Sequence, residues 1–147
     1  MEAQMVKMET AVEVKRTFQA PLSRVYKAWT DAEMMNHWFH PDGRMTSTCT
    51  VDLRVGGRYE VQMHGEKTFT VGGVYKEIVP EEKLVFTWRW QGEDTAEMLI
   101  TVLFNAVNDA ETELTLIHEQ FPNDEERDSH AQGWEGTLEQ LQVFLNQ

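Results

Sequence analysis

The sequence has a single cysteine, Cys49, so the chain cannot close an internal disulfide. A lone thiol suits a reducing compartment, and we expect a cytoplasmic protein. No stretch approaches the roughly 18 apolar residues that a membrane span requires. The first residues, Met1 to Met8, also lack the apolar core and cleavage site of a secretory signal. We therefore expect no membrane association.

Basic residues are scarce as well. The chain has 13 lysines and arginines against 25 acidic residues, which gives a formal net charge of −12. A field of this sign repels phosphate backbones and anionic lipid surfaces. The charge therefore excludes nucleic acid as an expected partner, whereas a basic protein or a small organic molecule is compatible with it.

Prolines and glycines punctuate the chain rather than dominate it, at four and nine residues. There is no internal repeat, low-complexity tract or linker, so we predict one domain over residues 1–147, with a core from about 11 to 145. A chain of this length buries about two-thirds of its unfolded surface on folding. Such a core needs no metal and no disulfide to hold it together.

Alternation of apolar and polar residues predicts seven strands. They cover residues 11–18, 45–53, 59–63, 69–79, 84–90, 98–104 and 113–121. Two short helices, begun by Pro21 and Asp31, separate the first strand from the others. A long helix begins near Asn123 and carries an apolar stripe of His130, Trp134, Leu138, Leu141 and Leu145. This order predicts an α+β fold, with a curved antiparallel sheet around a long C-terminal helix.

Two pairs of glycines interrupt these elements. The strand alternation loses phase at Gly72-Gly73, where we predict a β-bulge. Gly133 and Gly136 lie inside the long helix, where each costs about 1 kcal/mol relative to alanine. We attribute them to close packing against the first helices or the sheet, and the alternative is that they make room for a cavity.

Several short motifs together give the sequence a family resemblance. They are Arg16-x-Phe18-x-Ala20-Pro21, Val25-Tyr26-x-Ala28-Trp29-Thr30-Asp31, Trp38-Phe39-x-Pro41, Gly56-Gly57-x-Tyr59, Gly73-x-Tyr75-x-x-Ile78-x-Pro80, Leu84-x-Phe86-Thr87-Trp88, Thr112-x-Leu114-Thr115-Leu116-x-His118 and Gly133-Trp134. In this order they resemble the helix-grip superfamily of START and birch-pollen-allergen domains (SRPBCC). Within it, the sequence is most similar to the activator of heat-shock-protein-90 ATPase homologue 1-like family.

The resemblance implies a sheet that grips the C-terminal helix, with a cavity between them. The superfamily includes lipid carriers, cyclases, drug-sequestering resistance proteins and co-chaperone domains, so function has to be argued from a site. Co-chaperone members that stimulate the chaperone ATPase carry a further N-terminal domain. A chain of 147 residues has no room for one, so we do not expect ATPase activation.

The candidate site is a pocket between sheet and helix that holds a small apolar or aromatic ligand. Its expected wall is Met63, Trp88, Phe104, Trp134 and Leu138, with His118 fixing the ligand's orientation. His118 follows Leu114 and Leu116 in the inward strand phase. Trp88 and Trp90 share a phase too and, side by side, offer a flat aromatic wall; the alternative, which we favour for at least one of them, is ordinary core packing.

Two other functions remain as alternatives. One is a chaperone-associated protein-interaction domain, which predicts a filled core and an exposed apolar patch. The other is an enzyme of the cyclase or hydrolase kind that uses His118 as its general base. No second catalytic group is identifiable beside His118, so no catalytic residue is established, and we expect no cofactor.

Two polar features have structural explanations. Arg16 interrupts an apolar strand phase, and we expect it to bridge to a carboxylate rather than to fix a ligand anion. His37, His40 and Asp42 are residue types that ligate zinc, but the Pro41-Asp42-Gly43 turn is not a known ligand frame. We expect no metal site there.

Overall fold

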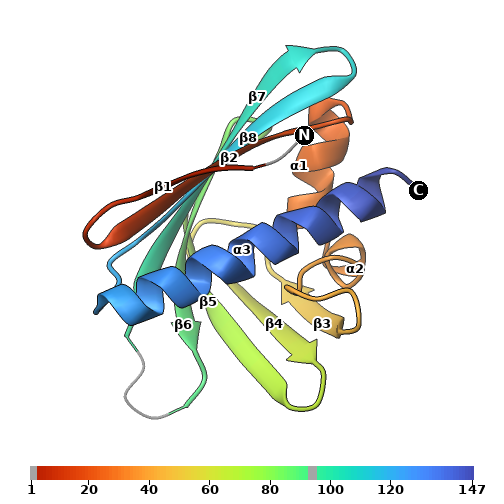
Figure 1. Ribbon diagram of the computed structural model, residues 1–147. Coiled ribbons are helices and arrows are strands. Elements are labelled where there is room, and N and C mark those ends of the chain that lie inside the picture. The colour runs from red at the N-terminus through yellow and green to blue at the C-terminus, as the bar shows by residue number, and fades with distance from the viewer. Residues whose placement is uncertain (1–2, 93–95) are drawn as a thin grey trace.

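The fold is seen in a computed structural model, which describes residues 3–92 and 96–147. In these residues eight strands form one antiparallel sheet, in the order β1-β2-β8-β7-β6-β5-β4-β3. The long helix α3 crosses one face of the curved sheet, and α1 and α2 lie near its C-terminal half (Figure 1). The helix-grip α+β fold predicted from the sequence is confirmed.

The elements follow the predicted order with one addition. The strands are β1 (Gln4–Lys7), β2 (Ala11–Phe18), β3 (Thr46–Val51), β4 (Arg58–His64), β5 (Thr68–Val79), β6 (Lys83–Trp90), β7 (Met98–Asn108) and β8 (Glu111–Glu119). The helices are α1 (Leu22–Thr30), α2 (Ala32–Met35) and α3 (Asp124–Leu145). The added strand is β1, which pairs with β2 at the sheet edge. Its residues are mostly exposed, so they lack the alternation that reveals the other strands.

The predicted helix starts at Asp31 and Asn123 are confirmed by their caps. The Asp31 carboxylate accepts hydrogen bonds from the backbone N–H groups of Glu33 and Met34, at 3.0 and 3.3 Å. The Asn123 side chain accepts one from the backbone N–H of Glu126 at 2.8 Å. Each cap satisfies donors that the first turn of a helix leaves unpaired.

The prediction of a bulge at Gly72-Gly73 was wrong. The register between β5 and β6 shifts instead between Tyr75 and Glu77. The glycine pair serves close packing, because a Cβ at Gly73 would overlap the carbonyl oxygen of Thr87 on β6. The loss of alternation thus reflected a close backbone approach, which requires glycine as a bulge often does.

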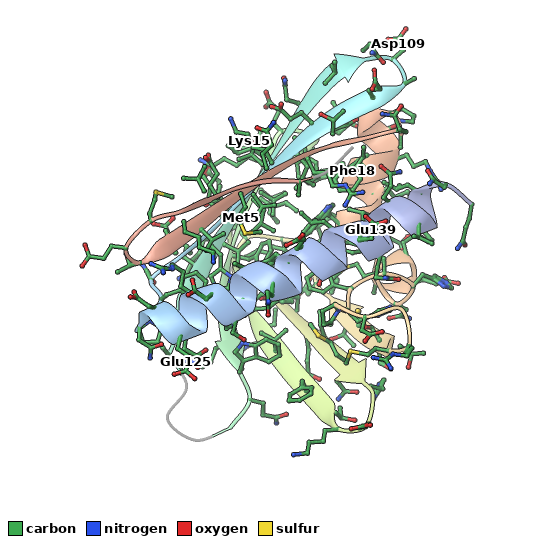
Figure 2. The ribbon with its side chains drawn as sticks, viewed as in Figure 1. Met5, Lys15, Phe18, Asp109, Glu125 and Glu139 are labelled. Atoms are coloured by element: carbon green, nitrogen blue, oxygen red, sulfur yellow. The ribbon has the colours of Figure 1, made fainter. Side chains whose placement is uncertain are left out.

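Arg16 forms the structural bridge that we expected. Its guanidinium lies 2.9 Å from the carboxylate of Glu139, and its side chain is only 7% exposed. The partner is on α3 rather than on the sheet, and Figure 2 shows Glu139 on the side of α3 that faces β2. The pair joins the first long strand to the C-terminal half of the helix.

The two glycines of α3 have different surroundings. A Cβ at Gly136 would overlap the carbonyl oxygen of Pro41, in the loop after α2. A Cβ at Gly133 would meet nothing within 4 Å. The packing explanation therefore holds for Gly136, and open space explains Gly133. The helix α3 therefore contacts the neighbouring loop closely at Gly136 and faces unfilled space at Gly133.

Among the described helices, none combines the length and the apolar character needed to cross a membrane.

The contrast between the two glycines gives a stability prediction. Gly136→Ala should lower the free energy of unfolding by about 1–3 kcal/mol, because its methyl group forces the helix away from Pro41. The matched Gly133→Ala change should raise that free energy by up to about 1 kcal/mol, since alanine favours the helix and meets no neighbour. Urea denaturation of both variants tests this. Equal effects of the two changes would contradict the packing described here.

Candidate ligand pocket

A pocket of about 350 Å³ lies between the first half of α3 and the sheet. Three parts of the chain line it: α3, the strands β4 to β6, and the loop that follows α2. The lining residues are Phe39, Pro41, Met63, Phe69, Trp88, Trp90, Glu126, Ser129, His130, Gly133, Trp134 and Thr137. Gly133 widens the pocket from the helix side, because it has no side chain to occupy the space that faces it.

Aromatic rings form most of the wall, and Trp88 is at their centre. Its ring centroid lies 6.1 Å from that of Phe39, 5.1 Å from that of Trp134 and 5.6 Å from that of Trp90. The expectation of a flat wall was wrong, because the rings of Trp88 and Trp90 meet at 90°. The Trp90 ring is held by a hydrogen bond from its indole nitrogen to His130. The two indoles therefore form a corner.

His118 is fully buried, with no exposed surface, and it is not among the residues that line the pocket. Its Nδ1 accepts a hydrogen bond from the indole N–H of Trp134 at 2.9 Å. The imidazole must be neutral to accept this bond. Burial, reinforced by the neighbouring His130, lowers the pKa of His118 from 6.5 to about 2. His118 is thus a very weak base that no ligand in the pocket reaches.

The imidazole that lines the pocket is that of His130. Its Nε2 accepts a hydrogen bond from the Trp90 indole at 2.8 Å, and its Nδ1 lies 2.8 Å from the Glu126 carbonyl oxygen. Nδ1 therefore carries the proton and donates to that carbonyl. Burial lowers the pKa of His130 as well, although the Glu126 carbonyl and carboxylate act in the opposite direction. Two tryptophans thus donate to two neutral histidines.

The six residues expected at the site divide into two groups. Met63, Trp88 and Trp134 line the pocket. Phe104, His118 and Leu138 do not line it and are buried in the core. Phe104 packs edge-on against Tyr26 of α1, with ring centroids 5.3 Å apart, under the other end of the sheet. Strand and helix periodicity identified the inward face correctly but did not locate the pocket along it.

Sequence reasoning did not assign His130, Phe39 and Phe69 to the site, although they line the pocket. The apolar stripe of the long helix already included His130, and this was the one signal that pointed to it. Phe69 is 52% exposed at the pocket wall. Exposure of a large aromatic side chain beside a pocket is a sign of a binding surface that only the folded structure reveals.

One buried donor among the described lining residues has no hydrogen-bond partner. The Trp88 indole nitrogen is buried and has no hydrogen-bond partner among residues 3–92 and 96–147. The Trp29 indole nitrogen, His118 Nε2 and Arg16 Nε share this condition, but these residues are not in the pocket lining. A buried donor without a partner costs about 1–3 kcal/mol.

The histidines near α2 have separate partners. His40 is buried, and its Nδ1 lies 2.8 Å from the Ser47 hydroxyl. His37 stacks on Phe144 with ring centroids 5.6 Å apart, and Asp42 pairs with Arg44 at 2.7 Å. Within the described part of the chain, no three His, Cys, Asp or Glu residues converge as a metal site would require.

The sequence model of the family described as Activator of Hsp90 ATPase homolog 1-like protein matches residues 19–146. No curated protein matches the chain. Among solved structures, the chain is similar to protein CV1439 from Chromobacterium violaceum, with 26% identity, coverage of 94% of this chain and 98% of that chain, and a TM-score of 0.81. The AHSA1 (SPO3351) protein from Silicibacter pomeroyi is 21% identical over 92% of this chain and 97% of its own, with a TM-score of 0.81. A protein from Arthrobacter aurescens has 20% identity, coverage of 97% and 91%, and a TM-score of 0.84.

The buried imidazole of His118 gives a pH prediction. The unfolded chain binds a proton below about pH 6.5, but the folded chain keeps His118 neutral down to about pH 2. Acid therefore favours unfolding across this window. Between pH 7.5 and 5, His118 alone should lower the free energy of unfolding by about 2 kcal/mol.

Urea denaturation of the parent and of His118→Gln at both pH values measures this contribution. The amide oxygen of glutamine still accepts from Trp134 but does not titrate. The variant should lose about 2 kcal/mol less than the parent on acidification. His37→Gln, which replaces an exposed histidine, is the matched control. Parallel pH profiles for the parent and His118→Gln would contradict the buried neutral state.

Proposed function

We propose that this chain, which belongs to the Activator of Hsp90 ATPase homolog 1-like family, binds a small apolar or aromatic molecule in the pocket beneath α3. The observation that carries the proposal is a pocket with aromatic walls in which the helix supplies a glycine instead of a side chain. Its volume of about 350 Å³ lies near the lower end of the 300–1,000 Å³ range typical of ligand sites. The ligand is therefore small.

Met63, Trp88 and Trp134 are the ligand contacts that we retain from the sequence, and His130 and Phe39 join them. The face of Trp88 packs against a planar ligand in this proposal. Phe104, His118 and Leu138 then support the fold around the pocket. In this arrangement His118 sets the position of Trp134 rather than that of the ligand.

Binding without turnover fits this site better than catalysis by His118. A general base must reach its substrate and have a pKa near the working pH. His118 is fully buried, accepts its hydrogen bond from Trp134, and has a pKa of about 2. His130 has both ring nitrogens engaged. Neither imidazole is therefore placed to take a proton from a ligand.

The family description names activation of the Hsp90 ATPase, which is an activity exerted on another protein. A protein-interaction domain requires an exposed binding surface and no internal pocket. Such a function would be insensitive to filling of the pocket, so the experiment below separates the two. We also propose a cytoplasmic location, on the ground that Cys49 is buried as a free thiol.

Filling the pocket from the helix side tests the proposed function. Gly133→Leu should abolish ligand binding, because its side chain enters the space that faces Gly133, where a Cβ meets nothing within 4 Å. The unliganded variant should melt at the parent's temperature or higher, since leucine favours the helix. The measurement is thermal shift with a library of apolar and aromatic compounds.

Compounds at about ten times their Kd should raise the melting temperature of the parent by roughly 3–6 °C. Gly133→Ala is the matched control, because it adds only a methyl group and should retain the shifts. Shifts of equal size in the parent and in Gly133→Leu would place binding elsewhere and remove the site assignment.

A further inference from the structure

Among the residues that the structure describes, the pocket lining carries one formal charge, that of Glu126. The other lining residues are apolar or neutral, and His130 is neutral because its Nε2 accepts from Trp90. The Glu126 side chain is 49% exposed and reaches to 3.8 Å from His130 Nδ1. A ligand that occupies the pocket therefore lies close to a carboxylate with no cation among the lining residues.

The aromatic wall adds to this preference for positive charge. The five rings are those of Phe39, Phe69, Trp88, Trp90 and Trp134. The face of an aromatic ring carries partial negative charge and attracts a cation within about 6 Å, and tryptophan does so most strongly. Three indoles and two phenyl groups around one small volume are the surroundings in which quaternary ammonium groups bind.

The pocket offers little to an anion, because most of its donors are already engaged. The indoles of Trp90 and Trp134 donate to His130 and His118, and the Thr137 hydroxyl donates to the Gly133 carbonyl at 2.7 Å. Recognition of a carboxylate or phosphate relies on arginine, lysine or several free N–H groups. Among the described residues, the lining has no arginine or lysine, and its one unpaired indole N–H, that of Trp88, is buried.

The nearby bases do not reverse this balance. Arg127, on the first turn of α3, bonds to Asp128 at 3.1 Å and to the Met8 carbonyl at 2.9 Å, so it is directed toward β1 and β2. Arg44 and Lys67 lie in a neighbouring depression that shares Phe69 with the pocket, beside Asp42 and Glu66. These two acidic and two basic residues give that depression no net formal charge.

The positive end of the α3 dipole would also attract anions, but the first turn offsets it. Asp124, Glu125 and Glu126 all lie there. The chain as a whole carries a net charge of −12. At long and short range, the potential at the pocket thus favours a positive ligand.

We propose that the pocket selects organic cations: a quaternary ammonium or protonated amine attached to a small apolar or aromatic body. The ammonium group lies between the indole faces and Glu126, and the apolar body packs on Trp88 and Met63. This inference rests on the proposed ligand-binding function and specifies the chemical class of the ligand.

Three probes of nearly equal shape test the charge preference. They are 3-hydroxyphenyltrimethylammonium, its neutral carbon isostere 3-tert-butylphenol, and the anion 3-hydroxybenzenesulfonate, with Kd measured by calorimetry at low salt. The cation should bind the parent about tenfold more tightly than the neutral probe, which is about 1.4 kcal/mol. The anion should bind more weakly than the neutral probe. Tighter or equal binding of the neutral probe would overturn the charge selectivity and leave the ligand-binding function standing.

Two neighbouring glutamates supply a matched pair of variants. Glu126→Gln should weaken binding of the cation by about three- to tenfold and change that of the neutral probe by less than twofold. Glu125→Gln removes the same charge from the same helix turn (Figure 2). Glu125 is exposed and is not among the pocket's lining residues. It should leave the affinity of the cation nearly unchanged.

The remaining outcomes are equally decisive. Equal losses in Glu126→Gln and Glu125→Gln would assign the preference to the overall charge and overturn the role of Glu126. If the cation still binds to Gly133→Leu, it pairs with acidic residues on the protein surface and not in the pocket, and the inference is overturned. Failure of all three probes to bind the parent would remove the ligand-binding function together with the charge preference.

Discussion

The hydrogen bond from Trp134 to His118 links the long helix to the sheet at the base of the pocket. Both residues are almost wholly buried, at 3% and 0% exposure. If this bond were broken, a donor and an acceptor would be left unpaired in the core, at about 1–3 kcal/mol for each group. The bond also keeps the imidazole neutral, since protonated histidine has no acceptor. The position of the Trp134 ring, and with it one wall of the pocket, follows from this contact.

The two halves of α3 meet the rest of the fold differently. Toward the C-terminus, Gly136 allows close contact with the Pro41 carbonyl, and Leu138 and Leu141 are fully buried. Toward the N-terminus, bulky rings such as those of Trp90 and His130 separate the helix from the strands, and Gly133 leaves the space between them open. The pocket therefore lies where large rings bound a space that Gly133 leaves unfilled.

Much of the fold could be predicted from periodicity. Inward phases placed Leu114, Leu116 and His118 in the interior, and all three are fully buried. The caps at Asp31 and Asn123 were also predictable, because short polar side chains at those positions satisfy the first turn of a helix.

The site was less predictable, for a physical reason. A period specifies which face of an element is buried but not how far from it the opposite layer lies. His118 and His130 therefore looked alike in the sequence, although only His130 lines the pocket. The angle between Trp88 and Trp90 depends on a hydrogen bond across 40 residues, from Trp90 to His130. The edge strand β1 lacked any apolar alternation to reveal it.

The five tryptophans allow a direct test of the pocket, because three line it and Trp29 and Trp38 do not. Titration with 2-naphthol, a neutral aromatic molecule with one polar group, can be followed through the five indole N–H signals by two-dimensional NMR. A ligand in the pocket should shift the signals of Trp88, Trp90 and Trp134 strongly and with one common Kd. The signal of Trp38, whose indole donates to the Ala28 carbonyl at 3.0 Å, should stay in place. Saturating binding that leaves the three pocket signals unmoved would contradict the account.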